Sequence, residues 1–163
     1  MNMIVTADAR WGIGYKDKLP VQIPRNQKLL AEETAGKVVV VGRKGLQTFP
    51  QGMPLQGRTT IVLSRNVNCN IKGATVVHSV EELRKMLEKY RSEDIFIVGG
   101  ESVFAQMLPY CDVVHVTKID HAYAADKFFA DLDKDPEWHI TAESDEQTYF
   151  DIAYEFIKYE RIK

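Results

Sequence analysis

The sequence predicts an α/β fold whose sheet is mixed, parallel through most of its width and antiparallel at one edge. Short apolar strand patterns alternate with helical patterns through most of the chain, as in βαβ units with a parallel sheet. Four consecutive valines, ending at Val41, are typical of a strand that is covered on both faces. Toward the C-terminus two strand patterns follow each other with no helix between them, which predicts an antiparallel hairpin at the edge.

The N-terminal part of the chain predicts a strand, a loop and a helix. Met3-Ile4-Val5 has the pattern of a short buried strand. Residues 11–15 hold two glycines among aromatic side chains and do not suit a regular element, so we expect a loop there. Pro24 favours the first turn of a helix, and Gly36 stands where a helix of this length would end.

Strands and helices alternate in the middle of the chain. Ser79 and Glu82 have the spacing of a capping box, so we expect a helix that begins at Val80. Another helix is predicted from about Ser102 to Leu108. The remaining strands are predicted over residues 37–41, 59–63, 75–77, 95–98, 113–118, 138–143 and 148–158.

Length and composition fit one domain over residues 1–163, since domains average roughly 150 residues. The chain has 21 Lys and Arg against 23 Asp and Glu, and a net charge of −2 gives no field to attract nucleic acid or an anionic membrane. The four histidines lack the spacing of metal ligands. We therefore expect a cytoplasmic monomer with no nucleic-acid partner, no membrane partner and no metal.

Two strand ends run directly into glycines and then into a helix, at Gly42 and at Gly99-Gly100. Glycines let a ligand approach the backbone, and a helix start offers unpaired N–H groups, so both turns suit a phosphate. Alternatively, these glycines only make tight turns, and neither turn has the dinucleotide-binding or P-loop spacing. Four basic residues that follow strands either surround an adenosine phosphate or are solvated surface charges: Arg43, Lys44, Arg65 and His78.

The order of these motifs resembles the dihydrofolate reductase family over nearly the whole chain, and looks closest to its branch in anaerobic Gram-positive bacteria. The resemblance implies a three-layer fold with an eight-stranded mixed sheet, NADPH as cofactor, and hydride transfer to C6 of 7,8-dihydrofolate to give tetrahydrofolate. The motifs that carry it are Trp11-Gly12-Ile13-Gly14, Leu19-Pro20, Ile23-Pro24, Gly42-Arg43-Lys44, Pro54-Leu55, Gly57-Arg58, Ile61-Val62-Leu63-Ser64-Arg65, Gly99-Gly100 and Thr117-Lys118-Ile119-Asp120.

The same resemblance implies two sets of binding residues. Arg58 would hold the glutamate carboxylate of folate, the loop over residues 9–18 would close over the nicotinamide, and Asp126 would anchor that loop. The implied substrate contacts are Ile4, Val5, Thr6, Gln27, Leu30, Phe49, Leu55, Arg58, Val98 and Thr117. The implied cofactor contacts are Thr6, Ile13, Gly14, Gly42, Arg43, Lys44, Gly45, Ser64, Arg65, His78, Val98, Gly99, Gly100, Glu101, Ser102, Val103 and Phe104.

The chain departs from the family pattern in the first helix. Where the family has an Asp or Glu two residues after the proline, this chain has Asn26. In the family that acid accepts hydrogen bonds from N3–H and the 2-amino group of the pterin, so Asn26 and Thr117 occupy the implied catalytic position. An amide offers a donor as well as an acceptor and carries no charge, which predicts weakened or pH-shifted activity. Glu32 and Glu33 lie nearly two helical turns away and are not expected to substitute.

Two further positions differ from the family. Gly45 stands where a threonine commonly binds the pyrophosphate, and Phe104 where a tyrosine usually lies near the nicotinamide. Each change implies the loss of one polar contact. Two alternatives to an active reductase therefore stay open: a non-catalytic paralogue that binds NADPH or folate, and a reductase of the same fold that acts on another heterocycle, such as a pyrimidine of riboflavin synthesis.

Overall fold

The computed structural model describes residues 1–16, 18–19 and 21–163. Asp17, within the predicted loop, and Pro20, within the Leu-Pro motif, lie outside the described residues. The helices are α1 (Pro24–Thr34), α2 (Arg43–Leu46), α3 (Val80–Leu87) and α4 (Glu101–Met107), with short 3-10 turns at Pro50–Gly52, Ser92–Asp94 and Leu108–Tyr110. The strands are β1 (Asn2–Ala7), β2 (Gly12–Gly14), β3 (Val38–Gly42), β4 (Thr59–Leu63), β5 (Ala74–Val77), β6 (Ile95–Ile97), β7 (Val113–Ile119), β8 (Lys127–Phe128), β9 (Trp138–Glu143), β10 (Gln147–Tyr149) and β11 (Ile152–Arg161).

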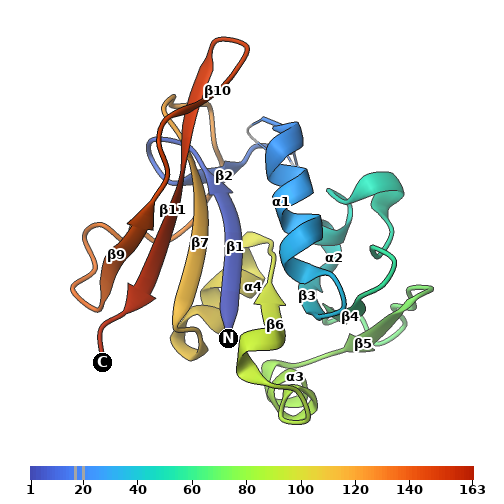
Figure 1. Cartoon of the computed structure of the whole chain (residues 1–163). Helices are drawn as coiled ribbons and strands as arrows, with labels where there is room; N and C mark the ends of the chain where they lie inside the picture. The colour runs from blue at the N-terminus through green and yellow to red at the C-terminus, as the bar shows by residue number, and fades with distance from the viewer. Residues whose placement is uncertain (17, 20) are drawn as a thin grey trace.

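One mixed sheet forms the centre of the molecule (Figure 1). Its order is β5-β4-β3-β6-β1-β7-β11, and all neighbours are parallel except β7 and β11. β9 and β10 both pair with β11, at different points along its length, so nine strands fill eight positions. The predicted mixed eight-stranded sheet with an antiparallel hairpin at its edge is confirmed.

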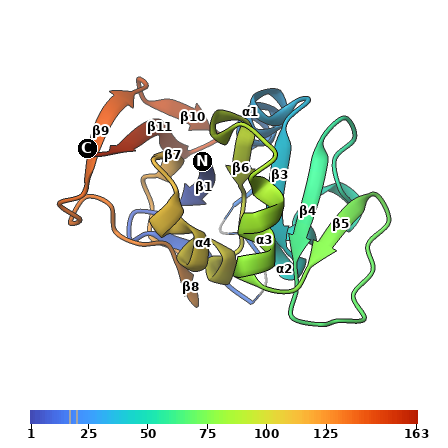
Figure 2. The same ribbon diagram turned by 90° about the horizontal axis from the view of Figure 1, so that it is seen from below.

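Helices cover the two faces of the sheet, and the valines of β3 show why. Val38 and Val40 pack in the cluster that contains α3 and α4, whereas Val39 and Val41 pack in the cluster on the α1 and α2 side. Successive side chains of a strand point to opposite faces, so a fully apolar strand needs helices on both. Figure 2 shows α1 on one side of the strands and α3 and α4 on the other.

The predicted capping box at the start of α3 forms with one difference. Ser79 Oγ accepts a hydrogen bond from the Glu82 backbone N–H at 3.0 Å, as the capping box predicts. The Glu82 carboxylate, however, accepts from the backbone N–H of His78 at 3.0 Å, one residue before the cap. The box therefore also fixes the backbone of His78, a predicted cofactor contact.

Two predictions about local structure are wrong. The predicted loop at residues 11–15 contains β2, because Gly12 and Gly14 pair with the distant strand β8. Residues 148–158 do not form one strand, because the chain turns at Phe150, whose φ of 55° is left-handed, and folds β10 back on β11. Among the described residues, the helices are all too short or too polar to cross a membrane.

Candidate functional site

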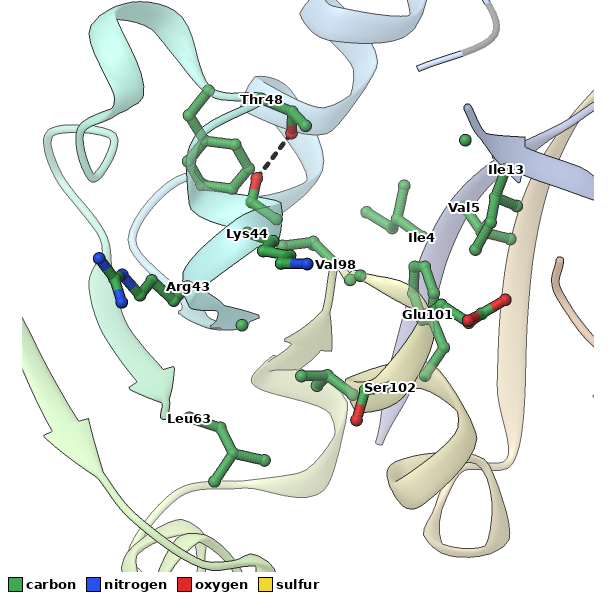
Figure 3. A pocket seen from close by; sticks show the side chains of 18 of the residues that line it. Ile4, Val5, Ile13, Arg43, Lys44, Thr48, Leu63, Val98, Glu101 and Ser102 are labelled. Atoms are coloured by element: carbon green, nitrogen blue, oxygen red, sulfur yellow. Dashed lines mark hydrogen bonds between the residues drawn. The ribbon is translucent and has the colours of Figure 1, made fainter. Parts of the chain in front are cut away.

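A cavity of about 1080 Å³ opens at the carboxyl ends of the parallel strands, beside α1 and α2. This edge of an open α/β sheet is where ligands usually bind. All of the predicted substrate and cofactor residues line the cavity except Arg58 and Thr117. Figure 3 shows Arg43 and Leu63 on one side of it and Val5, Ile13 and Glu101 on the other.

The end of the cavity beside α1 is built around Asn26. Thr6 and Thr117 are paired in register on the parallel strands β1 and β7, so both side chains point to the α1 face. Thr117 Oγ1 donates a hydrogen bond to Asn26 Oδ1 at 2.7 Å, and Asn26 Nδ2 donates to Thr6 Oγ1. The amide is thus held between two hydroxyl groups of neighbouring strands.

Thr117 itself lies behind Asn26 rather than on the cavity wall. It is buried, and it lines a second, smaller cavity of about 340 Å³ between α1, β7 and β11. The hydrogen bond from Thr117 to the pterin stays a prediction, because the hydroxyl group donates to Asn26 in the structure. The structure assigns Thr117 a positioning contact with Asn26.

Apolar side chains form the walls next to Asn26. Phe49 is buried and packs in one cluster with Leu30, Leu55 and Val98, and Ile4 contributes from the middle of β1. These side chains come from α1, the segment after α2, β1 and the end of β6, and all of them line the cavity. A flat heterocycle would bury its faces against them while its polar edge meets Asn26.

Arg58 lies outside the cavity wall, although the resemblance places it on the substrate. Its Nε donates to Thr34 Oγ1 at 3.3 Å, and its two terminal nitrogens donate to the carbonyl oxygens of Gln56 and Ala31. Arg58 therefore fastens the C-terminal half of α1 to the loop before β4. These bonds use three of the five guanidinium N–H groups, so a role in holding a carboxylate stays a prediction.

The opposite end of the cavity is made mainly of backbone. The Gly42 N–H donates to the Gly99 carbonyl oxygen at 2.7 Å, and the Gly99-Gly100 peptide bond is cis. A Cβ atom at Gly45 would lie 2.8 Å from the Gly100 nitrogen, so only glycine allows α2 to pack directly on this turn. The sequence predicts only the loss of a polar contact at Gly45, and the structure adds a packing reason for glycine there.

Basic residues gather around the outer part of the same end. Arg43 begins α2, Arg65 follows β4, and His78 follows β5, and all three line the cavity. The His78 ring nitrogen Nδ1 lies 2.9 Å from the Ser64 carbonyl oxygen, which fixes the ring beside the strand ends. The residues that sequence analysis grouped around an adenosine phosphate are thus brought to one place.

The segment between β1 and α1 is held by a buried carboxylate, Asp8, and by an exposed one, Asp126. The Asp8 carboxylate accepts hydrogen bonds from the backbone N–H groups of Arg10, Gly12 and Tyr123, at 2.8 to 2.9 Å. Asp126 accepts from the Lys16 N–H at 3.1 Å, and its own N–H donates to Gly14, so it contacts this segment as predicted. These bonds set the backbone that carries Ile13 and Gly14 to the cavity.

Trp11 packs away from the cavity. Its ring stacks on Phe129 with centroids 6.1 Å apart, and the Lys118 ammonium lies 3.5 Å from its centroid. Burial is the main cause that lowers the pKa of Lys118 below its ordinary value. Trp11 is therefore a core anchor of the segment rather than a ligand contact.

Sequence reasoning missed several lining residues. Some had a local signal, because Thr48 and Gln106 lie about one helical turn from predicted contacts on α2 and α4. Lys127 had none, since it reaches the cavity through the pairing of β8 with β2. The missed residues are Lys18, Leu19, Ala31, Thr48, Pro50, Leu63, Ser79, Val80, Glu81, Gln106 and Lys127.

Comparisons with known proteins agree with this architecture. The family model for dihydrofolate reductase matches residues 1–161. The chain is 33% identical to a dihydrofolate reductase of Staphylococcus haemolyticus, covering 100% of this chain and 96% of that one, and 28% identical to one of Bacillus subtilis, covering 99% and 94%. A solved dihydrofolate reductase from Enterococcus faecalis, complexed with NADP(H) and RAB-propyl, superposes with a TM-score of 0.85 at 31% identity, covering 99% and 96%. The chain belongs to the dihydrofolate reductase family.

Proposed function

We propose that this chain reduces 7,8-dihydrofolate to tetrahydrofolate with NADPH, and that Asn26 makes the reaction weak at neutral pH and faster in acid. Membership of the family supports the reductase activity and the cofactor. The pH dependence rests on one observation. The polar side chain held between Thr6 and Thr117, at the end of the cavity that fits a heterocycle, is a neutral amide.

The residues at the glycine-rich end fit NADPH. Gly100 lines the cavity, and a Cβ atom there would meet no atom within 4 Å, so a side chain would occupy space that a ligand needs. Arg43, Arg65 and His78 would hold the adenosine phosphate by charge-assisted hydrogen bonds. When bound, NADPH supplies the hydride that forms the new C–H bond at C6 of the dihydropterin.

The substrate must also gain a proton at N5, and this chain offers little help with it. An amide has no ionisable proton, and it carries no negative charge that would favour a protonated ring. Proton uptake then depends on substrate protonated by the solvent. The rate of hydride transfer should therefore rise as the pH falls.

A pH series tests the proposal. NADPH oxidation with dihydrofolate, followed by absorbance from pH 4 to pH 8, should be slow at neutral pH and should accelerate toward acid. Folding must be checked by circular dichroism at each pH, so that loss of structure is separated from loss of rate. An absence of turnover across the whole range, in protein that binds NADPH, would overturn the assignment.

A second candidate function is binding without turnover. Phe104 favours it, because its ring packs edge-on against Phe129 at 5.1 Å and has no hydroxyl group for a ligand. Calorimetry with NADPH and an antifolate would show binding for both candidates, and weak antifolate affinity would fit both because Asn26 lacks the charge that pairs with a protonated diamino ring. Turnover of dihydrofolate separates them.

A third candidate is reduction of a pyrimidine of riboflavin synthesis. The presence of Arg58 argues against it, because a substrate without a glutamate tail gives that residue no carboxylate to hold. The bonds of Arg58 to Thr34 and to two backbone carbonyls weaken this objection, because they give the residue a role within the protein. Comparing turnover of dihydrofolate with turnover of such a pyrimidine distinguishes these two reductases.

We also propose that the protein acts in the cytoplasm as a monomer without a nucleic-acid partner. The net charge of −2 supports the last point, because it gives no overall field that would attract a polyanion. Light scattering on a gel-filtration column should give the monomer mass of 18.6 kDa. A mass of twice that value would contradict the monomer.

A further inference from the structure

The Asn26 amide presents one donor and one acceptor to the cavity. A primary amide has two N–H groups and an oxygen with two lone pairs. One N–H is used by Thr6, and one lone pair is used by Thr117. Asn26 lines the cavity and is only half-buried, so the remaining N–H and lone pair are available to a ligand there.

Other groups at this end are neutral as well. Gln27, the next residue of α1, adds a second amide, and Thr6 adds a hydroxyl group. Among the described residues that line the cavity, the carboxylates are Glu81, in the first turn of α3, and Glu101, the first residue of α4. Glu101 is engaged there, since it accepts a hydrogen bond from the Phe128 N–H at 2.6 Å.

We infer that this wall selects heterocycles whose edge toward Asn26 carries an N–H beside a C=O, as the N3–C2 edge of a 2,4-dioxo ring does, over heterocycles whose same edge carries an N–H beside an amino group, as the N3–C2 edge of a 2-amino-4-oxo ring does. The Asn26 oxygen accepts from the ring N–H, and the Asn26 N–H donates to the ring C=O. Against an amino group the same N–H would meet another donor, which leaves both unpaired. The inference rests on the proposed function only in placing the ring in the slot beside Asn26.

Thr6 and Thr117 are positioning residues for this selection. They stand opposite each other on β1 and β7, and their spacing is set by the strand ladder rather than by a loop. The two hydroxyl groups hold the plane of the amide, which offers one donor and one acceptor rather than two acceptors.

Calorimetry with a matched pair of ligands tests the inference. Folate and 2-deamino-2-oxofolate differ at C2, where an oxo group replaces the amino group, and at N1, which gains a proton, and the shared tail at C6 keeps both rings in the same orientation. We expect the protein loaded with NADP⁺ to bind the 2-oxo ligand about 10- to 100-fold more tightly than folate, the cost of an unpaired buried donor. Asn26→Asp should reverse the order, because a carboxylate offers two acceptors and no donor.

Two variants test whether the ligand preference comes from the hydrogen-bonding groups of Asn26, and not from the charge of the wall or from a loss of folding. Gln27→Glu adds a negative charge on the same wall but leaves the Asn26 edge intact, so it should change both affinities by the same factor. Thr6→Val keeps the shape of the side chain but removes the partner of the amide nitrogen, so it should shrink the preference for the 2-oxo ring. Thermal unfolding shows whether each variant remains folded.

The binding measurements test the ring preference independently of the reductase activity. Equal binding of the two ligands, tighter binding of folate, or binding of neither would overturn it, as would a reversal of preference by Gln27→Glu. Dihydrofolate turnover by Asn26→Asp is measured separately. If the natural chain shows no dihydrofolate turnover from pH 4 to pH 8 the proposed function fails, and its ring preference still stands on its own measurement.

Discussion

The two ends of the cavity are built differently. The glycine-rich end, where we propose that the nucleotide binds, is called the nucleotide end below. The backbones of Gly42, Gly45 and Gly99 lie in close contact there, and α2 packs on the turn after β6. At the end beside α1, where we propose that the heterocycle binds, the polar surface consists of side chains: Asn26 is held by two others, and Gln27 adds a second amide. This difference determines which properties of the cavity a single substitution can change. A backbone surface keeps its donors and acceptors whatever the sequence, whereas a side-chain edge changes its pattern with one residue.

The two ends therefore need not change together. A substitution at Asn26 alters the match to the heterocycle without touching the glycine turn, because neither of its two side-chain partners belongs to that turn. A substitution at Gly45 moves backbone and affects the nucleotide end first. Loss of one function with retention of the other is the expected behaviour of such a cavity.

The largest expected effect comes from restoring an acid at the heterocycle end. Asn26→Asp should raise dihydrofolate turnover at neutral pH by about 10²- to 10⁴-fold, the usual contribution of acid–base assistance. NADPH affinity, measured by calorimetry on the same preparation, should stay unchanged. A matching change in NADPH affinity would show that the two ends are coupled, and no gain in turnover would show that Asn26 is not at the reacting ring.

Sequence patterns predicted those parts of the fold that depend on neighbouring residues. The valines of β3 face both ways because a buried strand alternates, and Ser79 caps α3 because its partner is three residues on. β2 was missed because it exists only through pairing with β8, more than 100 residues away. The turn at Phe150 was missed because its left-handed backbone is held by a residue with no turn preference.

The site shows the same division. Its lining was foreseen because the resemblance orders the motifs along the chain, and nearly all of these residues do line one cavity. What each residue touches was not foreseen. Arg58 binds α1, Thr117 stands behind Asn26, and Thr6 holds the amide, and each contact depends on side-chain directions set by tertiary packing.

At the nucleotide end the largest effect should come from adding a side chain. Gly45→Thr would place Cβ against the Gly100 nitrogen and the Gly99 carbonyl carbon, so the free energy of unfolding should fall by about 1 to 3 kcal/mol, as for other overpacked sites. Chemical denaturation measures the free energy of unfolding. Gly36→Thr is not a suitable control, because Gly36 has a left-handed φ of 74° that would strain a threonine. Thr48→Val is the better control, since it removes only one hydrogen bond to Gly45 in the same region. A stable Gly45→Thr variant with tighter NADPH binding would mean that the glycine marks a lost contact and not close packing.

A smaller effect is expected from the exposed cation at the same end. Arg43→Ala should weaken NADPH binding by about 5-fold, because an exposed charge pair contributes only about 1 kcal/mol. Binding of NADH, which has no 2′-phosphate, should not change. Calorimetry with both cofactors provides the comparison, and an equal loss for each would place Arg43 elsewhere than at that phosphate.

The smallest effect concerns stability in the acid range where turnover is expected to rise. His115 lies on β7 two residues before Thr117, and burial is the main cause that lowers its pKa below 6.5, with Lys158 acting in the same direction and Glu33 and Glu160 opposing. The unfolded chain then binds more protons than the folded one below pH 6.5, so His115 costs stability as the pH falls through that range. His115→Gln should therefore lose less stability than the natural chain between pH 6.5 and pH 5 in denaturant titrations. If the two proteins lose stability in parallel, His115 is not the group that limits the acid range. If they diverge, this variant is the protein in which the acid activity of the Asn26 site can be measured furthest from unfolding.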